Sequence, residues 1–183
     1  MTTPGVWGKR LLRRRRRWSL TLAGALALMA LTGAFPGGAG AAVFTVSGHI
    51  ASGVSDLPGV SVSLTDTTTP GTVTSTTDSF GNYSFSGVNG GDDYTITPSL
   101  TNYTFSPSSI SITFLAADSP GNDFSASLNT YSISGNVSGA SGVSVALSGS
   151  ASSSTVTDGS GNYSFTGLNA GGNYTVTPSK TNY

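Results

Sequence analysis

The sequence contains no cysteine, and beyond residue 42 it contains no glutamate, no arginine and one lysine, Lys180. Without cysteine the chain forms neither disulfides nor thiolate zinc sites, and it offers no cysteine nucleophile. Without a basic surface the body cannot neutralise phosphates, which excludes a nucleic-acid-binding protein. The single histidine, His49, is the only imidazole available for acid–base chemistry.

The formal net charge of zero combines two unlike parts of the chain. Seven of the eight basic residues lie within the first 17 positions, whereas all eight acidic residues are aspartates between positions 56 and 158. A basic leader therefore precedes an acidic body, and the two parts are analysed separately. Once the leader is removed, the acidic body is expected to repel both nucleic acid and anionic membranes.

The first 41 residues have the three-zone layout of a secretory signal peptide. A basic stretch ends in Arg13–Arg17, an apolar run of about 12 residues follows, and small residues precede position 42. The apolar run is shorter than the roughly 20 residues that a membrane-spanning helix needs. We therefore predict a signal helix and a secreted, extracellular or cell-surface protein, with no membrane insertion after cleavage.

The predicted cleavage site follows Ala41, with Ala39 and Ala41 as the small residues that a signal peptidase accepts. The alternative is an uncleaved anchor over residues 18–35. The arginine run also loosely resembles a twin-arginine export signal, so the export route stays open.

The body is an internal repeat, and such repeats define the architecture before any motif does. The matching segments are 44–48 with 131–135, 59–64 with 142–147, 78–85 with 158–165, and 94–99 with 174–179. The offset between copies falls from 87 to 80, and the difference lies in two loops, 51–58 and 65–75. Length changes confined to loops are typical of a packed β-scaffold.

Apolar residues alternate with Ser or Thr in every repeated segment, as in Val60, Val62 and Leu64. Period two predicts half-buried antiparallel strands, and the intervening Gly, Pro, Asn and Asp predict turns. The sequence thus predicts an all-β protein of tandem antiparallel, Ig-like or prealbumin-like β-sandwiches, each of about seven strands. The expected domains are residues 43–128 and 131–183.

The second repeat is expected to be incomplete. The first continues beyond Tyr103 for about 25 residues through Phe105, 110–114 and Phe124, whereas the second reaches only Tyr183. A sandwich without its last strands leaves unpaired edges and an open core. Either the sequence is part of a longer reading frame, or another chain supplies the missing strands.

One motif carries a family resemblance: Asp78-x-x-Gly81-Asn82-Tyr83-x-Phe85, with its copy over 158–165. Together with the surrounding strand patterns it resembles the carboxypeptidase regulatory-like, transthyretin-like β-sandwich family and the B-type repeats of bacterial surface adhesins. The resemblance implies secreted or surface-displayed modules that serve as spacers, adhesin stalks or appendages of secreted enzymes. It also implies a fold related to carbohydrate-binding sandwiches, although a fold does not determine a function.

Carboxylates offer the one candidate for a metal site. Asp78 precedes a tight turn, where its side chain is expected to accept backbone N–H groups. The functional alternative is calcium, for which Asp78, Asp92 and Asp93 are candidates because Ca²⁺ prefers several oxygen ligands. We otherwise expect no cofactor.

His49 and the tyrosines have similar alternatives. His49 is expected on the solvent face of its strand rather than in a Ser-His-Asp triad. The repeated tyrosines are expected to fill the core with their hydroxyls at its rim, the alternative being a sugar-stacking platform.

These observations predict a secreted or surface repeat protein that is structural or adhesive and not an enzyme. The alternative is a carbohydrate-binding module, attached to a secreted hydrolase encoded beyond residue 183. Expected partners are an extracellular polysaccharide or protein surface and neighbouring repeats.

Overall fold

The computed structural model describes residues 42–180, which form strands and loops. Within this range no helix is long and apolar enough to cross a membrane. The predicted signal peptide, with Ala39 and Ala41, lies outside the described residues. The all-β fold is confirmed.

Two consecutive groups of strands make up the described chain. Unit 1 contains β1 (Val43–Ser52), β2 (Ser55–Asp56), β3 (Ser61–Asp66), β4 (Gly71–Thr76), β5 (Asn82–Asn89), β6 (Tyr94–Ser99), β7 (Tyr103–Ser106), β8 (Ile110–Ile112) and β9 (Phe124–Leu128). Unit 2 contains β10 (Thr130–Asn136), β11 (Ser144–Gly149), β12 (Ser153–Val156), β13 (Asn162–Asn169) and β14 (Tyr174–Ser179).

Unit 1 is a sandwich of two sheets. In one sheet β1 pairs with β5, β2 and β9, and β9 pairs with β7; the other sheet has the order β4-β3-β6-β8. Nine strands occur where about seven were predicted, because β2 and most of β4 lie in the segments 51–58 and 65–75, which were predicted to be loops. The strand pairings are antiparallel, as predicted, with one exception: β9 lies parallel to β1. After β8 the chain crosses from one sheet to the other, and it then enters beside β1 in the same direction.

The alternating residues of unit 1 form its core, as the sequence predicted. Val46, Ile50, Val62 and Leu64 are fully buried, and these residues come from β1 and β3 in opposite sheets. Phe114 breaks the expected pattern: its side chain is 70% exposed, its φ is 50°, and the next residue is buried instead. A left-handed residue turns the chain, so the strand alternation does not continue through it.

Unit 2 repeats part of this arrangement. β10 pairs with β13, and β12, β11 and β14 form a second sheet. The β10–β13 register matches the β1–β5 register, including an irregularity between Tyr131 and Ile133 that corresponds to one between Phe44 and Val46. The described part of unit 2 contains no counterpart of β7, β8 or β9.

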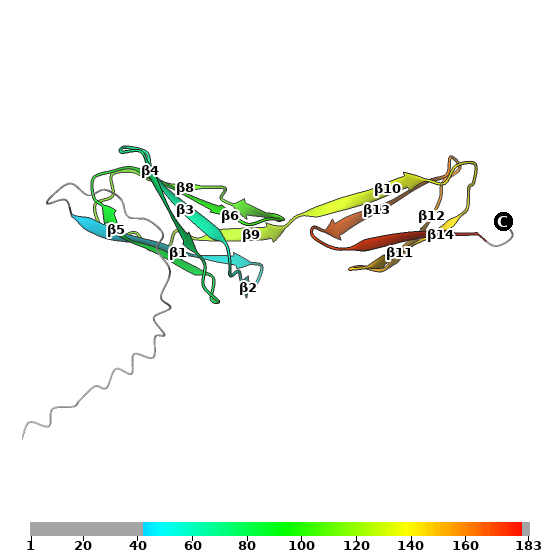
Figure 1. The fold of residues 1–183 in the computed structure, drawn as a ribbon, viewed down its shortest axis with the longest axis horizontal. Helices are drawn as coiled ribbons and strands as arrows, with labels where there is room; N and C mark the ends of the chain where they lie inside the picture. The colour runs from blue at the N-terminus through cyan, green and yellow to red at the C-terminus, as the bar shows by residue number, and fades with distance from the viewer. Residues whose placement is uncertain (1–41, 181–183) are drawn as a thin grey trace, which may run out of the picture.

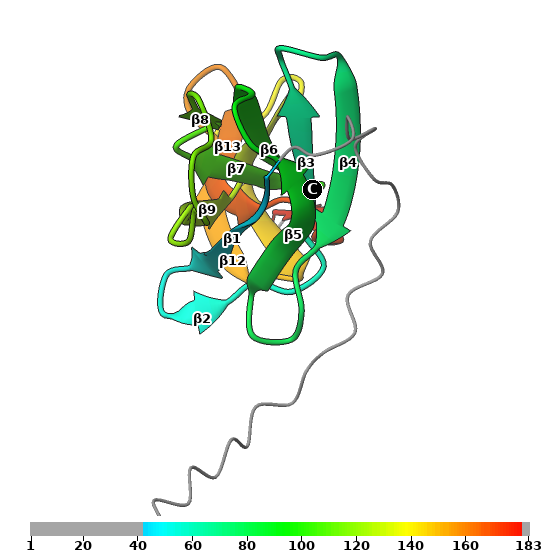
Figure 2. The same cartoon turned by 90° about the vertical axis from the view of Figure 1, so that its left-hand side faces the viewer.

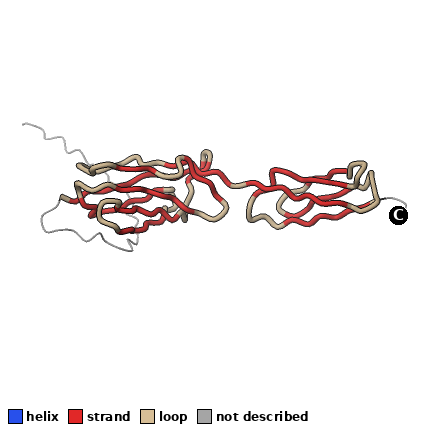
Figure 3. The backbone as a smooth tube through the Cα atoms, turned by 90° about the horizontal axis from the view of Figure 1, so that it is seen from above, coloured by secondary structure: helices blue, strands red, loops and turns tan. Residues whose placement is uncertain are grey.

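The two units lie end to end in an elongated molecule (Figure 1). One residue, Asn129, separates β9 from β10, so the chain passes almost directly from a strand of unit 1 into a strand of unit 2. The view from above shows the same linear arrangement (Figure 3). Viewed along the long axis, unit 1 lies in front of unit 2 (Figure 2).

Candidate functional site

The most specific motif of the sequence folds into the same turn in both units. Asp78 accepts hydrogen bonds from the N–H groups of Phe80 and Asn82, both at 2.9 Å. Asp158 accepts the corresponding bonds from Ser160 and Asn162 at 2.8 Å. The predicted aspartate turn is therefore present before β5 and again before β13.

The pKa values of these two carboxyls follow from the turn. Burial acts to raise the pKa of Asp78, but the backbone hydrogen bonds from Asn82 and Phe80 outweigh it and leave the pKa lowered. The backbone and side chain of Asn162 lower the pKa of Asp158. Hydrogen bonds to the ionised form favour ionisation, so both carboxylates are stabilised as anions by the turns whose N–H groups they accept.

The three calcium candidates are not brought together. Asp78 precedes β5 while Asp92 and Asp93 follow it, and a strand of 8 residues spans about 25 Å at ~3.3 Å per residue. A carboxylate oxygen of Asp93 accepts the N–H of Phe114 at 2.7 Å. Among residues 42–180 no group of three or more His, Asp or Glu side chains is placed to hold a metal ion.

His49 lies at a partly exposed corner of unit 1. Its Nε2 is 2.9 Å from a carboxylate oxygen of Asp56, and its backbone N–H donates to Asp123 at 2.8 Å. Both members of the His49–Asp56 pair remain accessible to water, where such pairs contribute little to stability. The ring is held by a carboxylate of the adjoining hairpin.

Two of the three tyrosines of unit 1 lie in its core, and the third, Tyr103, is partly buried against that core. Tyr83 and Tyr94 are almost fully buried, and their hydroxyls donate to the carbonyls of Asn122 and Asn89. Burial raises the pKa of both phenols, that of Tyr94 to about 12. The faces of Tyr83 and Tyr94 are therefore closed to a sugar ring, whereas in unit 2 Tyr163 and Tyr174 are half buried and Tyr131 is exposed.

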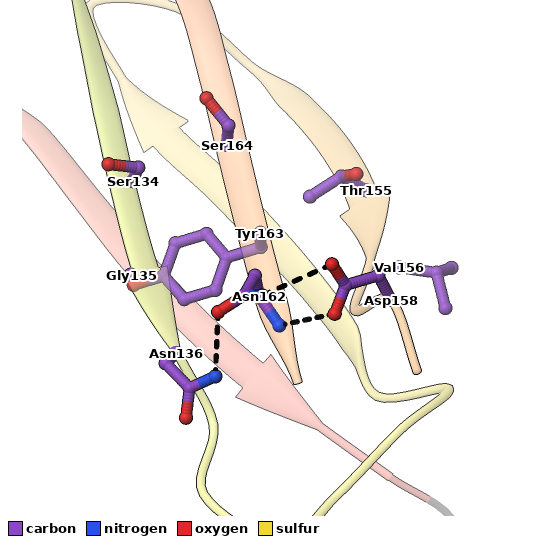
Figure 4. Close-up of a pocket in the computed structure, with 9 residues that line it drawn as sticks. All are labelled: Ser134, Gly135, Asn136, Thr155, Val156, Asp158, Asn162, Tyr163 and Ser164. Atoms are coloured by element: carbon purple, nitrogen blue, oxygen red, sulfur yellow. Dashed lines mark hydrogen bonds between the residues drawn. The ribbon is translucent and has the colours of Figure 1, made fainter. Parts of the chain in front are cut away.

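The close-up of unit 2 shows an open depression beside β10 (Figure 4). The ring of Tyr163 lies across Gly135 on the neighbouring strand, where a Cβ would come within 2.5 Å of the tyrosine hydroxyl. The side-chain amide of Asn162 donates to a carboxylate oxygen of Asp158 at 3.2 Å, and its oxygen accepts the side-chain amide of Asn136 at 2.8 Å. The floor of this depression is thus held by hydrogen bonds, and Gly135 is required because the tyrosine occupies the space of a side chain.

The junction of the two units is a second candidate site, built from Asn102, Asn129, Ala170 and Gly171. The N–H of Asn129 donates to the carbonyl of Asn102 in unit 1, and its own carbonyl accepts the N–H of Ala170 in unit 2, both at 2.8 Å. Its side-chain oxygen accepts the hydroxyl of Thr104 at 2.6 Å. A Cβ on Gly171 would lie 2.9 Å from the side-chain nitrogen of Asn102, so the two units approach closely here.

Sequence comparison relates the chain to β-sandwich and chitinase sequences. Residues 42–120 match the family described as BOS complex subunit NOMO1-like, second beta sandwich domain. The chain is 33% identical over 144 residues to Chitinase ChiA of Flavobacterium johnsoniae, in a match that covers 76% of this chain and 9% of that protein. The chain therefore spans less than a tenth of the length of this relative. Membership of the carboxypeptidase regulatory-like family stays a prediction.

Structural comparison supports the same fold. The Bacillus anthracis TIE protein is similar with a TM-score of 0.56 at 14% identity, over 75% of this chain and 28% of that chain. A streptococcal ancillary pilin gives a TM-score of 0.42 at 12% identity, over 75% of this chain and 54% of the pilin. At these identities the first likeness supports a β-sandwich fold and nothing further.

Two features of these sites were not predicted from the sequence. Nothing in the residue pattern marks Asn129 as a contact between units, because its partners lie in turns distant in the sequence. The Gly135–Tyr163 pair, in contrast, could have been found, since Gly48 and Tyr83 recur at the same positions and pair in the same register.

Proposed function

We propose that the chain is a non-catalytic pair of β-sandwich modules that holds neighbouring parts of a secreted or surface-displayed protein apart. The observation that carries this proposal is the junction: one residue connects the units, and its N–H and carbonyl bond to opposite units. Short, hydrogen-bonded connections resist bending, whereas flexible linkers of Gly and Ser behave as random coils. A stiff, elongated pair of sandwiches suits a spacer or stalk.

The chemistry-bearing side chains support a structural role. The carboxylates of Asp78 and Asp158 hold turns, and that of Asp93 holds the backbone of Phe114. His49 contacts Asp56 where both side chains are accessible to water. A catalytic group needs a partner and a position next to a bound substrate, whereas the three aspartates are arranged to satisfy backbone N–H groups.

The spacer proposal is tested by measuring how far apart the units stay. Because the sequence has no cysteine, Val54→Cys in unit 1 and Gly159→Cys in unit 2 provide two unique sites for spin labels at exposed positions. Pulsed electron paramagnetic resonance on the labelled chain is expected to give one narrow distance distribution. An insertion of Gly-Gly-Ser-Gly after Asn129 is expected to broaden it.

The matched control is the same insertion after Gly139, in a loop of unit 2 with open space around it. This insertion lengthens the chain by the same amount but leaves the junction intact, so the distribution should remain narrow. A wild-type distribution as broad as that of the junction variant would contradict the spacer proposal.

A second candidate function is a carbohydrate-binding appendage of a secreted hydrolase, and the similarity to a chitinase favours it. Exposed aromatic side chains are the expected contacts with sugar rings, and Phe80, Phe114 and Tyr131 are all more than half exposed. Phe80 and Phe114 lie at opposite ends of β5, where they cannot form one platform. The spacer proposal therefore predicts no retention of the chain on insoluble chitin; retention that is lost with an alanine at one of these positions would favour the second candidate.

The secreted location depends on the leader predicted for residues 1–41. N-terminal sequencing of the exported protein should give a first residue of Ala42. Exported material that retains the arginine run would contradict the predicted cleavage after Ala41.

A further inference from the structure

In unit 1 the free side of β1 is covered by residues 118–126, called here the covering segment. The N–H of Ser119 donates to the carbonyl of Thr45 at 2.8 Å, and the carbonyl of Ser119 accepts the N–H of Ser47 at 3.0 Å. The N–H of Asn122 then donates to the carbonyl of Ser47 at 3.1 Å. β9 continues this contact as a parallel strand beside the end of β1.

Side chains of the covering segment complete the contact. A carboxylate oxygen of Asp118 accepts the N–H of Thr45, and one of Asp123 accepts the N–H of His49, both at 2.8 Å. These two carboxylates and the carbonyl of Ser119 accept every second N–H group of β1, on the side of the strand that faces away from β5. The covering segment thus recognises a strand edge through its backbone and two carboxylates.

Unit 2 presents the same edge. The N–H of Val137 donates to the carbonyl of Gly161 at 2.9 Å, as the N–H of Ile50 does to that of Gly81. The equivalent N–H groups of β10 and β1 therefore point toward β13 and β5, and the alternate ones point away. The backbone groups that correspond to the covered ones of β1 belong to Ser132, Ser134 and Asn136, which we call the open β10 edge. Within residues 42–180, β10 pairs with β13 alone.

The core next to the open β10 edge is also incompletely covered. Three residues that are half buried in unit 2 correspond to fully or almost fully buried residues of unit 1: Tyr163 to Tyr83, Ile133 to Val46, and Val176 to Ile96. In unit 1 the ring of Phe124, from the covering segment, lies 6.5 Å from that of Tyr83, whose hydroxyl donates to Asn122. An occupant of unit 2 therefore needs an aromatic side chain at this position.

We infer that the open β10 edge binds an extended peptide segment with the pattern Asp-x-x-x-Asn-Asp-Phe-x-Ala, parallel to β10. Its backbone and carboxylates pair with Ser132, Ser134 and Asn136, and its phenylalanine covers Tyr163. In the sequence, Asn-Asp-Phe occurs once, at 122–124, and in unit 1 that copy is already bound to β1. Pairing of two open β10 edges from two molecules would satisfy the backbone but would leave Tyr163 uncovered.

The test uses the full chain and a fluorescent synthetic peptide with the sequence of residues 115–128. We expect saturable binding with one peptide per chain, measured by fluorescence anisotropy. Hydrogen exchange followed by mass spectrometry should show new protection over residues 132–136 and none over residues 45–49, whose edge is already covered. This localises the peptide whether or not the units act as a spacer.

Peptide variants provide controls that cannot unfold the protein. A peptide with Phe124→Ser is expected to bind at least about tenfold more weakly, because the apolar contact with the open core is lost. A scrambled peptide should not bind. In the protein, Ser134→Pro removes one edge N–H and should also abolish binding.

Three results would overturn the inference. They are the absence of saturable binding up to about 1 mM peptide, equal binding of the scrambled peptide, and protection located in unit 1 or on the edge of β14. Protection of residues 132–136 that rises with protein concentration in the absence of peptide would instead assign the edge to a second copy of the chain, and would also overturn it.

Discussion

Replacing Tyr83 with phenylalanine removes one hydroxyl and leaves the packing of the ring intact. The ring lies against Phe85 and Phe124, with centroids 6.0 and 6.5 Å away, and a phenylalanine keeps both contacts. The hydroxyl donates to the carbonyl of Asn122, which lies on the segment that closes the sandwich. Tyr163 occupies the same position in unit 2, yet its hydroxyl has no hydrogen-bond partner among the described residues.

The two substitutions should therefore have very different costs. In Tyr83→Phe the carbonyl of Asn122, a buried residue, loses its donor, and an unsatisfied buried group costs about 1–3 kcal/mol. In Tyr163→Phe no bond is lost, so the free energy of unfolding should change by less than about 0.5 kcal/mol. For a domain of this size each kcal/mol lowers Tm by about 4–8 °C.

Hydrogen exchange under native conditions measures the opening free energy of each unit separately in the intact chain. We expect faster exchange in β1, β5 and β9 of the Tyr83→Phe variant and unchanged exchange in unit 2. The Tyr163→Phe variant is the matched control. Equal losses in the two variants, or no loss in either, would refute the argument that the hydroxyl of Tyr83 fixes the covering segment.

Three further predictions concern stability. Burial raises the pKa of Tyr94 to about 12, above the unfolded value near 10. The neutral phenol therefore contributes to stability below pH 10, and this contribution is lost as pH rises toward 12. In urea unfolding, the free energy of unfolding of unit 1 should fall by up to roughly 1.4 kcal/mol per pH unit in this range, and by less in Tyr94→Phe. The buried hydroxyl of Thr157 accepts the N–H of Val143 at 3.0 Å, so Thr157→Val should destabilise unit 2 by about 1–3 kcal/mol in urea unfolding; an unchanged midpoint would contradict this. The pKa of Asp158 is lowered in the folded state, so the carboxylate stabilises unit 2 at pH values above its unfolded pKa, and this stabilisation is lost as pH falls through the lower folded pKa. On acidification, Asp158→Ala should lose less stability to urea than the wild type. Identical acid profiles would contradict a stabilising role for the Asp158 turn.

The predictable part of the fold was encoded in short stretches of sequence. The alternation over 60–64 placed Val60, Val62 and Leu64 in the core, where all three are fully buried. The aspartate turns were equally local, because Asp78 bonds to residues two and four positions ahead. Period two and turn chemistry involve neighbours along the chain, so they can be recognised without a structure.

The candidate sites depended on distances that the sequence does not contain. Asp78 and Asp93 are 15 positions apart, but a strand between them carries them to opposite ends of unit 1. In the sequence, Phe114 continues the apolar alternation of Ile110 and Ile112. In the structure, its positive φ turns the chain and leaves the ring exposed. Its exposure follows from the loop in which it lies, where Asp93 binds its backbone N–H.

The sequence by itself determined the repeats, the strands and the acidic, cysteine-free composition, since each is a property of residue order and type. Only the tertiary structure decided that β9 lies parallel to β1, that Asn129 joins the two units by bonds in both directions, and that within residues 42–180 β10 pairs with β13 alone. Each of these is a pairing between backbone groups far apart in the chain. Such pairings depend on which edge is free when the sheets come together, and backbone groups are the same for every side chain.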